Sequence, residues 1–307
     1  YQPYACSAAV YDKAKELRTM QIMVEAFIDG DSSADYNAGY GTSAHKGDLQ
    51  GITNNLDYIK GLGVNAIWLT PIFESTKKSG QDEWADKLDA TGYFTSNYFK
   101  IDPNFGTLDQ AKTLVQEAHK RGMYVFLDGV FGHHKDNLVA SPSGLKPKSK
   151  YQTGSTTNQD AVYSGYQEDD TLKFYKEVAT YWINELKIDG WRLDQAYQVP
   201  VGAWGEIRKA VEEASASASY TNGSGESVHP LGYMFGELWS GASDIAKNGY
   251  GTTAQPGLCS NFDFPLRYSI TETLAVNESS VGKKDADALD AGFNTRVVYP
   301  SHAVPNV

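Results

Sequence analysis

The stretch Tyr124-Val-Phe-Leu-Asp128-Gly-Val-Phe-Gly-His133-His134 carries the strongest clue to the fold, because an apolar run ends in an acid and two histidines. A short run of β-branched and aromatic residues predicts a buried strand. The pattern at 107–121 before it predicts a helix, in which Thr107 suits the start and Gly122 follows the end. A helix that leads into a buried strand is typical of parallel βα units.

The same alternation of short apolar runs and longer amphipathic stretches continues along the chain. Strands are predicted at 21–27, 66–69, 124–127, 190–193, 234–237 and 258–262, and helices at 47–62, 107–121, 171–186 and 201–214. The 307 residues suffice for two domains or for one large α/β barrel. The sequence has no internal repeat with a period of about 20–50 residues, which excludes solenoids and propellers.

Residues 135–169 interrupt this alternation, since they are rich in Ser, Gly, Thr, Lys and Pro. They follow a predicted strand and precede a predicted helix. Loops longer than about 15 residues in compact domains are usually functional lids or inserted subdomains. At the carboxyl end of a barrel strand, such an excursion would form a wall of a substrate site.

Charge and apolar run length exclude two classes of partner. Lys and Arg number 27 against 38 Asp and Glu, which gives a net charge of −11. An acidic chain repels phosphate backbones and anionic membranes, so we expect neither nucleic acid nor a membrane as partner. The longest near-continuous apolar runs, at 65–73 and 122–127, are far shorter than the roughly 18 residues of a membrane span.

Aromatic and cysteine content add weaker indications. Trp, Tyr and Phe number 6, 20 and 12, or 12% of the chain, and such rings can serve as stacking platforms for sugars. Cys6 and Cys259 cannot make a disulfide framework, but one long-range bridge between them stays open. The start at Tyr1 without Met suits a secreted protein, extracellular or periplasmic, after processing, or a trimmed chain.

Polar groups follow three of the predicted strands. Asp128 and His133 follow the first, Arg192 and Asp194 lie two apart on the second, and Glu237 ends the third. Residues two apart on a strand point to the same face. In a parallel barrel, all of these groups would converge at one mouth.

Two carboxylates with an arginine beside one of them suit retaining glycoside hydrolysis. Arg192 would lower the pKa of Asp194 and keep this nucleophile ionised. A partly desolvated Glu237 would hold a proton and donate it to the leaving oxygen. The alternative is that Arg192 and Asp194 form an ordinary buried ion pair and that Glu237 is a helix N-terminal carboxylate.

Over nearly its whole length, the chain resembles members of glycoside hydrolase family 13, the α-amylase family. Segments 128–133, 190–194 and 236–239 resemble its first three signatures, and segments 45–52, 63–71, 92–94 and 101–107 resemble supporting motifs in the family's order. The resemblance implies a (β/α)8 TIM-type barrel with an inserted subdomain after the third strand. Residues 1–134 and 170–307 would then form the barrel, and 135–169 the inserted subdomain.

The resemblance also implies a role for each site residue. Asp194 would be the nucleophile that forms a β-glycosyl-enzyme intermediate, and Glu237 the general acid and then base. Asp128 would be a strand-end carboxylate more than a catalyst. The residues expected around the substrate are Tyr93, Asp128, His133, Arg192 and Trp239.

The implied function is an α-amylase-family glycosidase or transglycosylase that acts on α-glucosidic bonds of α-glucans or α-glucosides. Hydrolysis and transfer share one intermediate, so glucanotransferase and glucoside isomerase activities stay open. The alternative from another class is a carbohydrate-binding or partner-binding homologue that has lost catalysis. A phosphate-binding barrel enzyme is disfavoured, because no Gly-rich phosphate loop occurs late in the chain.

The chain departs from the family pattern at three places. The Asn usual in the first signature, which helps to bind calcium between the barrel and the inserted domain, is Gly132 here. Tyr197 and Gln198 stand where many amylases carry a Lys-His pair, and Thr91 replaces a His before Gly92. Acceptor-side specificity is therefore not predicted.

A different calcium site is predicted near the N-terminus. The loop from Asp29 to Asp35 resembles the N-terminal calcium loop of cyclodextrin glucanotransferases. Hard oxygen ligands on a Gly-containing loop suit Ca²⁺, whose role would be structural. The predicted ligands are Asp29, Asp31, Asp35 and Asp48, and the alternative is an exposed acidic turn.

The end of the chain leads to a last expectation. A seventh strand begins only near 305–307, and the family's fourth signature, a His-Asp pair that supplies a third carboxylate, is absent. His302 does not replace it, because no Asp follows. We therefore expect a further segment or chain to supply the last strands, that carboxylate and a C-terminal β domain.

Overall fold

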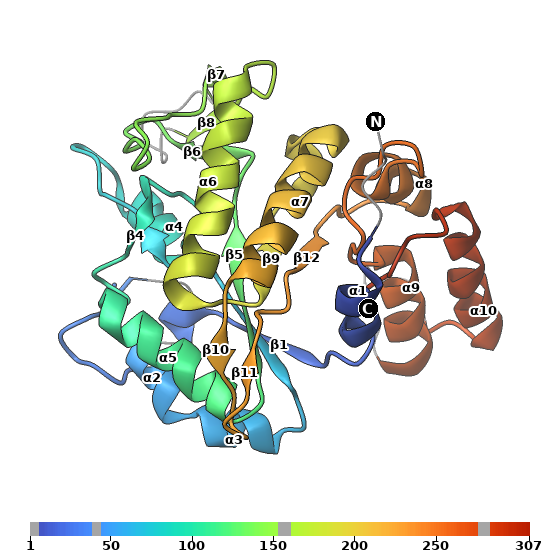
Figure 1. The fold of residues 1–307 in the computed structure, drawn as a ribbon, viewed down its shortest axis with the longest axis horizontal. Coiled ribbons are helices and arrows are strands. Elements are labelled where there is room, and N and C mark those ends of the chain that lie inside the picture. Colours follow the sequence, from blue (N-terminus) through green and yellow to red (C-terminus); the bar gives the residue numbers. More distant parts are fainter. Residues whose placement is uncertain (1–5, 39–43, 153–160, 276–282) are drawn as a thin grey trace.

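Five parallel strands form the centre of the computed structural model, which describes residues 6–38, 44–152, 161–275 and 283–307 (Figure 1). Their order in the sheet follows their order in the chain: β1 (Thr19–Ile22), β2 (Ala66–Leu69), β5 (Tyr124–Gly129), β9 (Gly190–Leu193) and β12 (Tyr233–Gly236). Each neighbouring pair is parallel. This run of parallel β/α units is the kind that builds a (β/α)8 barrel.

Single bridges continue the sheet beyond β12. Gly236 pairs with Asn261, and Phe262 pairs with Asn306, both in parallel. The predicted strand at 258–262 is therefore present only as isolated bridges. Asn306 lies in the segment where a seventh strand was expected to begin.

The outer layer consists of helices that connect these strands (Figure 1). They are α2 (Leu49–Asn54), α3 (Leu56–Gly61), α5 (Leu108–Lys120), α6 (Asp169–Leu186) and α7 (Val201–Ser217). Thr107 begins α5 with a capping box, in which its hydroxyl accepts from the Gln110 N–H and the Gln110 side chain accepts from the Thr107 N–H. The predicted helix at 47–62 is two helices, which meet at Asn55.

Most strand predictions are confirmed within a residue or two, but the first is partly wrong. The strands at 66–69 and 190–193 match β2 and β9. β1 ends at Ile22, and η1 (Val24–Ala26) follows as a 3-10 turn. The Val24 N–H bonds to the Thr70 hydroxyl at 3.0 Å, so the sheet ladder stops there.

A separate three-stranded antiparallel sheet follows β5, the third parallel strand. It contains β6 (His133–Lys135), β8 (Ala161–Ser164) and β7 (Ser149–Gln152) in that order. The remaining elements are α1 (Ala8–Ala14), β3 (Phe73–Glu74), α4 (Glu83–Ala90), β4 (Asn97–Ile101), η2 (Ala196–Gln198), β10 (Tyr220–Thr221), β11 (Ser227–Val228), α8 (Ala242–Asp244), η3 (Ile245–Tyr250), α9 (Phe264–Ile270), η4 (Thr271–Ala275), α10 (Ala286–Asn294) and η5 (Thr295–Val298).

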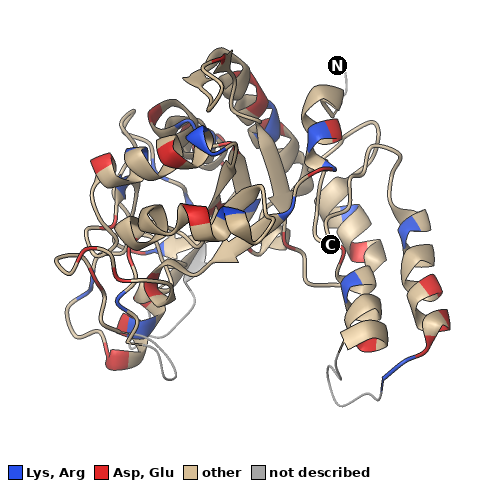
Figure 2. Ribbon diagram, turned by 90° about the horizontal axis from the view of Figure 1, so that it is seen from below, with Lys and Arg blue, Asp and Glu red and all other residues tan. Residues whose placement is uncertain are grey.

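Packing and one covalent link hold these layers together. Trp182, Trp191 and Trp204 are fully buried between helices and sheet. Cys6 and Cys259 form a disulfide with Cα atoms 5.9 Å apart, which ties the N-terminal segment to the strand-like segment after β12. Lys and Arg are interspersed with Asp and Glu along the described helices (Figure 2). Among the described residues, every helix is too short or too polar to cross a membrane.

Candidate active site

The predicted site residues lie at the carboxyl ends of adjacent parallel strands. Asp128 is near the end of β5 and pairs in register with Arg192 of β9. Asp194 follows β9 directly, and Glu237 follows β12. The parallel register therefore brings together four groups that lie up to 109 residues apart, from position 128 to position 237.

The guanidinium group of Arg192 is the centre of this arrangement. Its Nη1 donates to both carboxylate oxygens of Asp128 at 2.9 Å and to Oδ1 of Asp194 at 3.0 Å. Its Nη2 contacts Oε2 of Glu237. One buried cation thus binds all three carboxylates. The sequence had paired Arg192 with Asp194 alone.

Asp128 supports this centre from below. Its side chain is fully buried, and its Oδ2 also accepts from Trp68 Nε1 and from the Tyr93 hydroxyl, each at 3.0 Å. Burial raises the pKa of Asp128 from 3.8 to about 6, since the loss of water outweighs the lowering effect of Arg192. These partners agree with the interpretation of Asp128 as a strand-end carboxylate that holds the arginine.

Arg192 keeps its charge despite its burial. Removal from water lowers its pKa, but the neighbouring Asp128, Tyr93 and Asp194 raise it more, so the net shift is upward. Its guanidinium carbon also lies 4.6 Å from the centre of the Trp68 ring, within cation–π range. Trp68 was missed as a site residue, although a tryptophan inside a short parallel strand was visible in the sequence.

Tyr93 and His133 form one side of the site. His133 lies with Nε2 3.0 Å from the Tyr93 carbonyl oxygen and Nδ1 2.9 Å from Oε1 of Gln198. Burial raises the pKa of the Tyr93 hydroxyl well above its ordinary range. Gly92 has φ +85°, and a Cβ there would meet the Pro71 carbonyl oxygen at 2.1 Å, so the turn before Tyr93 requires glycine.

Trp239 lies at the edge of the site rather than inside it. Its side chain is 71% exposed, two residues beyond Glu237. The indole Nε1 donates to the Tyr268 hydroxyl at 2.8 Å, and the ring stacks on Phe264 with centroids 6.1 Å apart. The loop after β12 and helix α9 therefore present an aromatic surface to solvent.

Two of the four predicted calcium ligands, Asp48 and Asp31, accept hydrogen bonds from within the protein. Asp48 accepts from the backbone N–H groups of Gly30, Asp31 and Gly51 at 2.7–3.2 Å and caps α2. Asp31 accepts from Ser33 and from the Gln110 amide. No group of three or more His, Cys, Asp or Glu side chains in the described part of the chain is placed to hold a metal ion.

This geometry gives the calcium prediction, with Asp29 and Asp35 as its remaining ligands, no support. It stays a prediction. Chelation in a calcium-containing buffer tests it, because a structural cation stabilises the folded state that binds it. A fall in melting temperature would support the site.

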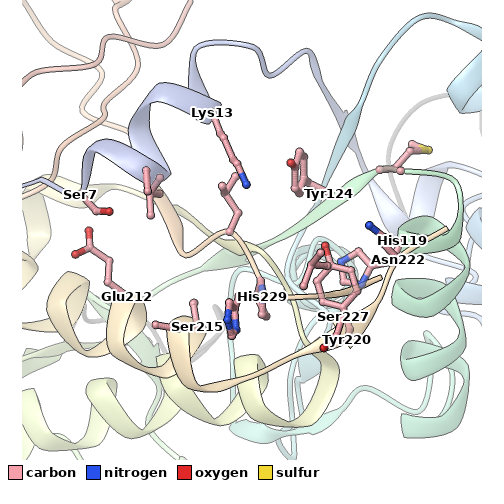
Figure 3. A pocket seen from close by; sticks show the side chains of 18 residues that line it. Ser7, Lys13, His119, Tyr124, Glu212, Ser215, Tyr220, Asn222, Ser227 and His229 are labelled. Carbon is pink, nitrogen blue, oxygen red and sulfur yellow. The ribbon is translucent and has the colours of Figure 1, made fainter. Parts of the chain in front are cut away.

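A large pocket lies at the opposite end of the parallel strands (Figure 3). It has a volume of about 650 Å³ and contains none of the predicted site residues. Its lining comes from α1, the start of β5, α7 and the β10–β11 hairpin, and includes Lys13, His119, Tyr124, Glu212, Tyr220 and His229. This pocket is therefore separate from the carboxylate cluster.

Parallel β/α units with carboxylates gathered on one arginine at the strand ends define the architecture of α-amylase-type glycoside hydrolases. The family model described as "Alpha amylase, catalytic domain" matches residues 21–153. The chain belongs to this family, glycoside hydrolase family 13.

Individual relatives agree with this assignment. The chain is 31% identical to a cyclomaltodextrinase of Geobacillus thermopakistaniensis over 86% of its own length and 41% of the relative's. It is 30% identical to neopullulanase 2 of Thermoactinomyces vulgaris, over 94% of its own length and 48% of that protein's. The crystal structure of AmyP in complex with maltose is 56% identical, with a TM-score of 0.91 over 98% of this chain and 58% of that chain. The chain thus spans less than half the length of these two curated relatives.

Proposed function

We propose that this chain carries the active site of a retaining glycoside hydrolase or transglycosylase that acts on α-glucosidic bonds. The observation that carries the proposal is the binding of Asp194 and Glu237 to the same Arg192 guanidinium, at the mouth of parallel strands. Relatives named cyclomaltodextrinase and neopullulanase, and AmyP structures with maltose and maltotriose, support an α-glucan as substrate.

The proposed reaction has two steps. A carboxylate oxygen of Asp194 attacks the anomeric carbon while the bond to the leaving oxygen breaks and Glu237 gives that oxygen its proton. Glu237 then takes a proton from a water or a sugar hydroxyl, whose oxygen attacks the anomeric carbon and releases Asp194. Because the attack is direct, we expect the two carboxyl groups to lie about 5–5.5 Å apart in a substrate complex.

The surrounding residues would divide the remaining work. Arg192 keeps Asp194 ionised, and Asp128 keeps Arg192 in place. His133 would meet hydroxyls of the sugar, and Tyr93 would stack under it. The architecture proposed around them is a (β/α)8 barrel to which residues 1–134 and 170–307 contribute all but the last strands, with 135–169 as the inserted subdomain.

A product profile tests the proposal. The full-length protein would be incubated with maltose, isomaltose, sucrose, starch and cyclodextrin, and the reducing ends and transfer products would be measured. Turnover with retained anomeric configuration supports the proposal. Binding of maltotriose without turnover would favour a carbohydrate-binding homologue instead.

Secretion is a further proposal for this protein. The disulfide between Cys6 and Cys259 supports it, because such bridges persist in oxidising compartments. Fractionation of the native host would test it, with the protein expected outside the cytoplasm.

A further inference from the structure

The ring of His133 is held from both of its nitrogens. Nε2 faces the Tyr93 carbonyl oxygen at 3.0 Å, and Nδ1 faces the Gln198 amide at 2.9 Å. The Tyr93 hydroxyl in turn donates to Asp128, which binds Arg192. A continuous set of contacts therefore joins the loop after β9 to the carboxylate cluster through His133.

Gln198 is itself fixed by its neighbours. Its amide nitrogen donates to Oε1 of Gln195 at 2.8 Å, and the Tyr197 hydroxyl donates to the same oxygen at 2.9 Å. Gln195 has φ +40°, in the left-handed region that few non-glycine residues adopt. The turn after Asp194 thus aims the Gln198 side chain at His133.

Gly132 provides the space that Gln198 occupies. A Cβ at position 132 would lie 2.3 Å from both Cβ and Oε1 of Gln198, far inside van der Waals contact. Gly132 is not among the glycines with positive φ, so the backbone itself would accept alanine. Position 132 therefore needs glycine because the Gln198 side chain approaches the backbone so closely.

We propose that Gln198 is a positioning residue of the active site, which orients the His133 imidazole and depends on Gly132 for its own place. The inference rests on the proposed function, in which a sugar hydroxyl takes the place of the Tyr93 carbonyl oxygen at Nε2 of His133 while Gln198 keeps Nδ1. A carboxamide suits this task because its oxygen accepts from Nδ1 while its nitrogen donates to Gln195. An aliphatic side chain would leave the ring held by Tyr93 alone.

Kinetics of three variants of the full-length protein test the role. With maltotriose as substrate, Gln198→Met and Gly132→Ala should each lower kcat/KM by about tenfold, the effect of one lost orienting hydrogen bond. Gln198→Glu keeps an acceptor for Nδ1 but loses the donor to Gln195, so its kcat/KM should lie between those of the wild type and Gln198→Met. Gly61→Ala is the matched control, because a Cβ there meets open space at the end of α3.

A double-mutant cycle separates positioning from general structural damage. In a His133→Ala background, Gln198→Met should cost no further kcat/KM, because Gln198 acts through the ring that is already missing. Full additivity of the two losses would overturn the proposal, and so would wild-type kinetics for Gln198→Met.

Thermal unfolding of the four proteins of this cycle, which are the wild type, the two single variants and the double variant, gives a test that does not depend on activity. The contact predicts a non-additive change in stability between Gln198→Met and His133→Ala. Independent effects on unfolding would overturn the proposed contact. Inactivity of the wild type on every α-glucan, with the coupling in unfolding still present, would overturn only the proposed function.

Discussion

Strand β9 has a buried aspartate just outside each end, and the two are used in opposite ways. Asp189 precedes the strand and is fully buried. It lies 2.8 Å from His119 Nε2 and accepts the backbone N–H groups of Val125 at 2.9 Å and Leu231 at 3.0 Å. Asp194, after the strand, is 8% exposed and binds Nη1 of the Arg192 guanidinium at 3.0 Å.

The difference matches a structural role for Asp189 and the chemical role proposed for Asp194. Backbone N–H groups of β5 and of the segment before β12 donate to Asp189. Its carboxylate therefore links these two segments to the start of β9. Asp194 shares Arg192 with Asp128 and Glu237, so three carboxylates compete for one guanidinium group. Its carboxylate therefore has capacity left for a substrate atom.

The largest effect is expected from substitutions at the carboxyl end of the strands, where Asp194 and Glu237 lie. Asp194→Asn should lower turnover by about 10⁴-fold or more, because the nucleophile is lost, while the fold persists. Glu237→Gln should slow both steps, but less for substrates with very good leaving groups, which need no proton. Steady-state rates on starch and on an activated α-glucoside measure this. Equal residual activity of both variants on every substrate would contradict the assigned roles.

The next largest effect is expected at the start of β9, where Asp189 is buried. Asp189→Ala leaves two buried backbone N–H groups and His119 without their acceptor, which should cost about 3–5 kcal/mol of unfolding free energy. Asp194→Ala is the matched control at the other end of the strand. It leaves Arg192 paired with Asp128 and should cost much less. Urea unfolding followed by fluorescence gives both values, and equal losses would refute the contrast.

The sequence predicts the chemical end better than the structural one. Asp128, Arg192, Asp194 and Glu237 each stand at or just beyond a short apolar run, so parallel strands must bring them to one edge. Asp189 also flanks a strand, but two of its partners are backbone N–H groups, which carry no signature in the sequence, and the third is His119, 70 residues away.

Contacts between side chains from distant segments were the hardest to predict. The approach of Trp68 to Arg192 depends on ring orientation and packing, which periodicity does not report. The contact of Gln198 with His133 depends on the unusual turn at Gln195. The sequence allowed two interpretations of Asp48, because a carboxylate can bind a cation or begin a helix. In the structure it begins α2 and accepts a hydrogen bond from the Gly51 N–H.

A smaller effect concerns Asp128, which binds Arg192, and appears as a pH dependence of stability. Because the pKa of folded Asp128 is raised to about 6, the unfolded chain ionises there first as the pH rises. Asp128 therefore stabilises the fold most below about pH 4, and this contribution is lost by about pH 6, a change of about 1–3 kcal/mol.

Unfolding free energies of wild type and Asp128→Asn between pH 4 and 7 measure this contribution. The wild-type curve should fall relative to the variant across that interval and run parallel above it. Asp102, whose pKa burial also raises to about 6, titrates in both proteins and cancels in the difference. Curves that stay parallel throughout would show that Asp128 remains ionised in the folded protein.

The smallest expected effect lies at the exposed rim of the same end. Trp239 contacts Tyr268 and Phe264 but is largely open to solvent, so its removal should leave the fold intact. If a sugar ring stacks on it, Trp239→Ala should raise KM by about three- to tenfold, the range of an aromatic stacking contact, with kcat almost unchanged. Tyr58→Ala is the control, since Tyr58 is equally exposed on α3, the helix that leads into the opposite end of β2. A fall in kcat at constant KM would contradict this role. It would instead show that Trp239 contributes to the transition state beside Glu237, and not only to substrate binding.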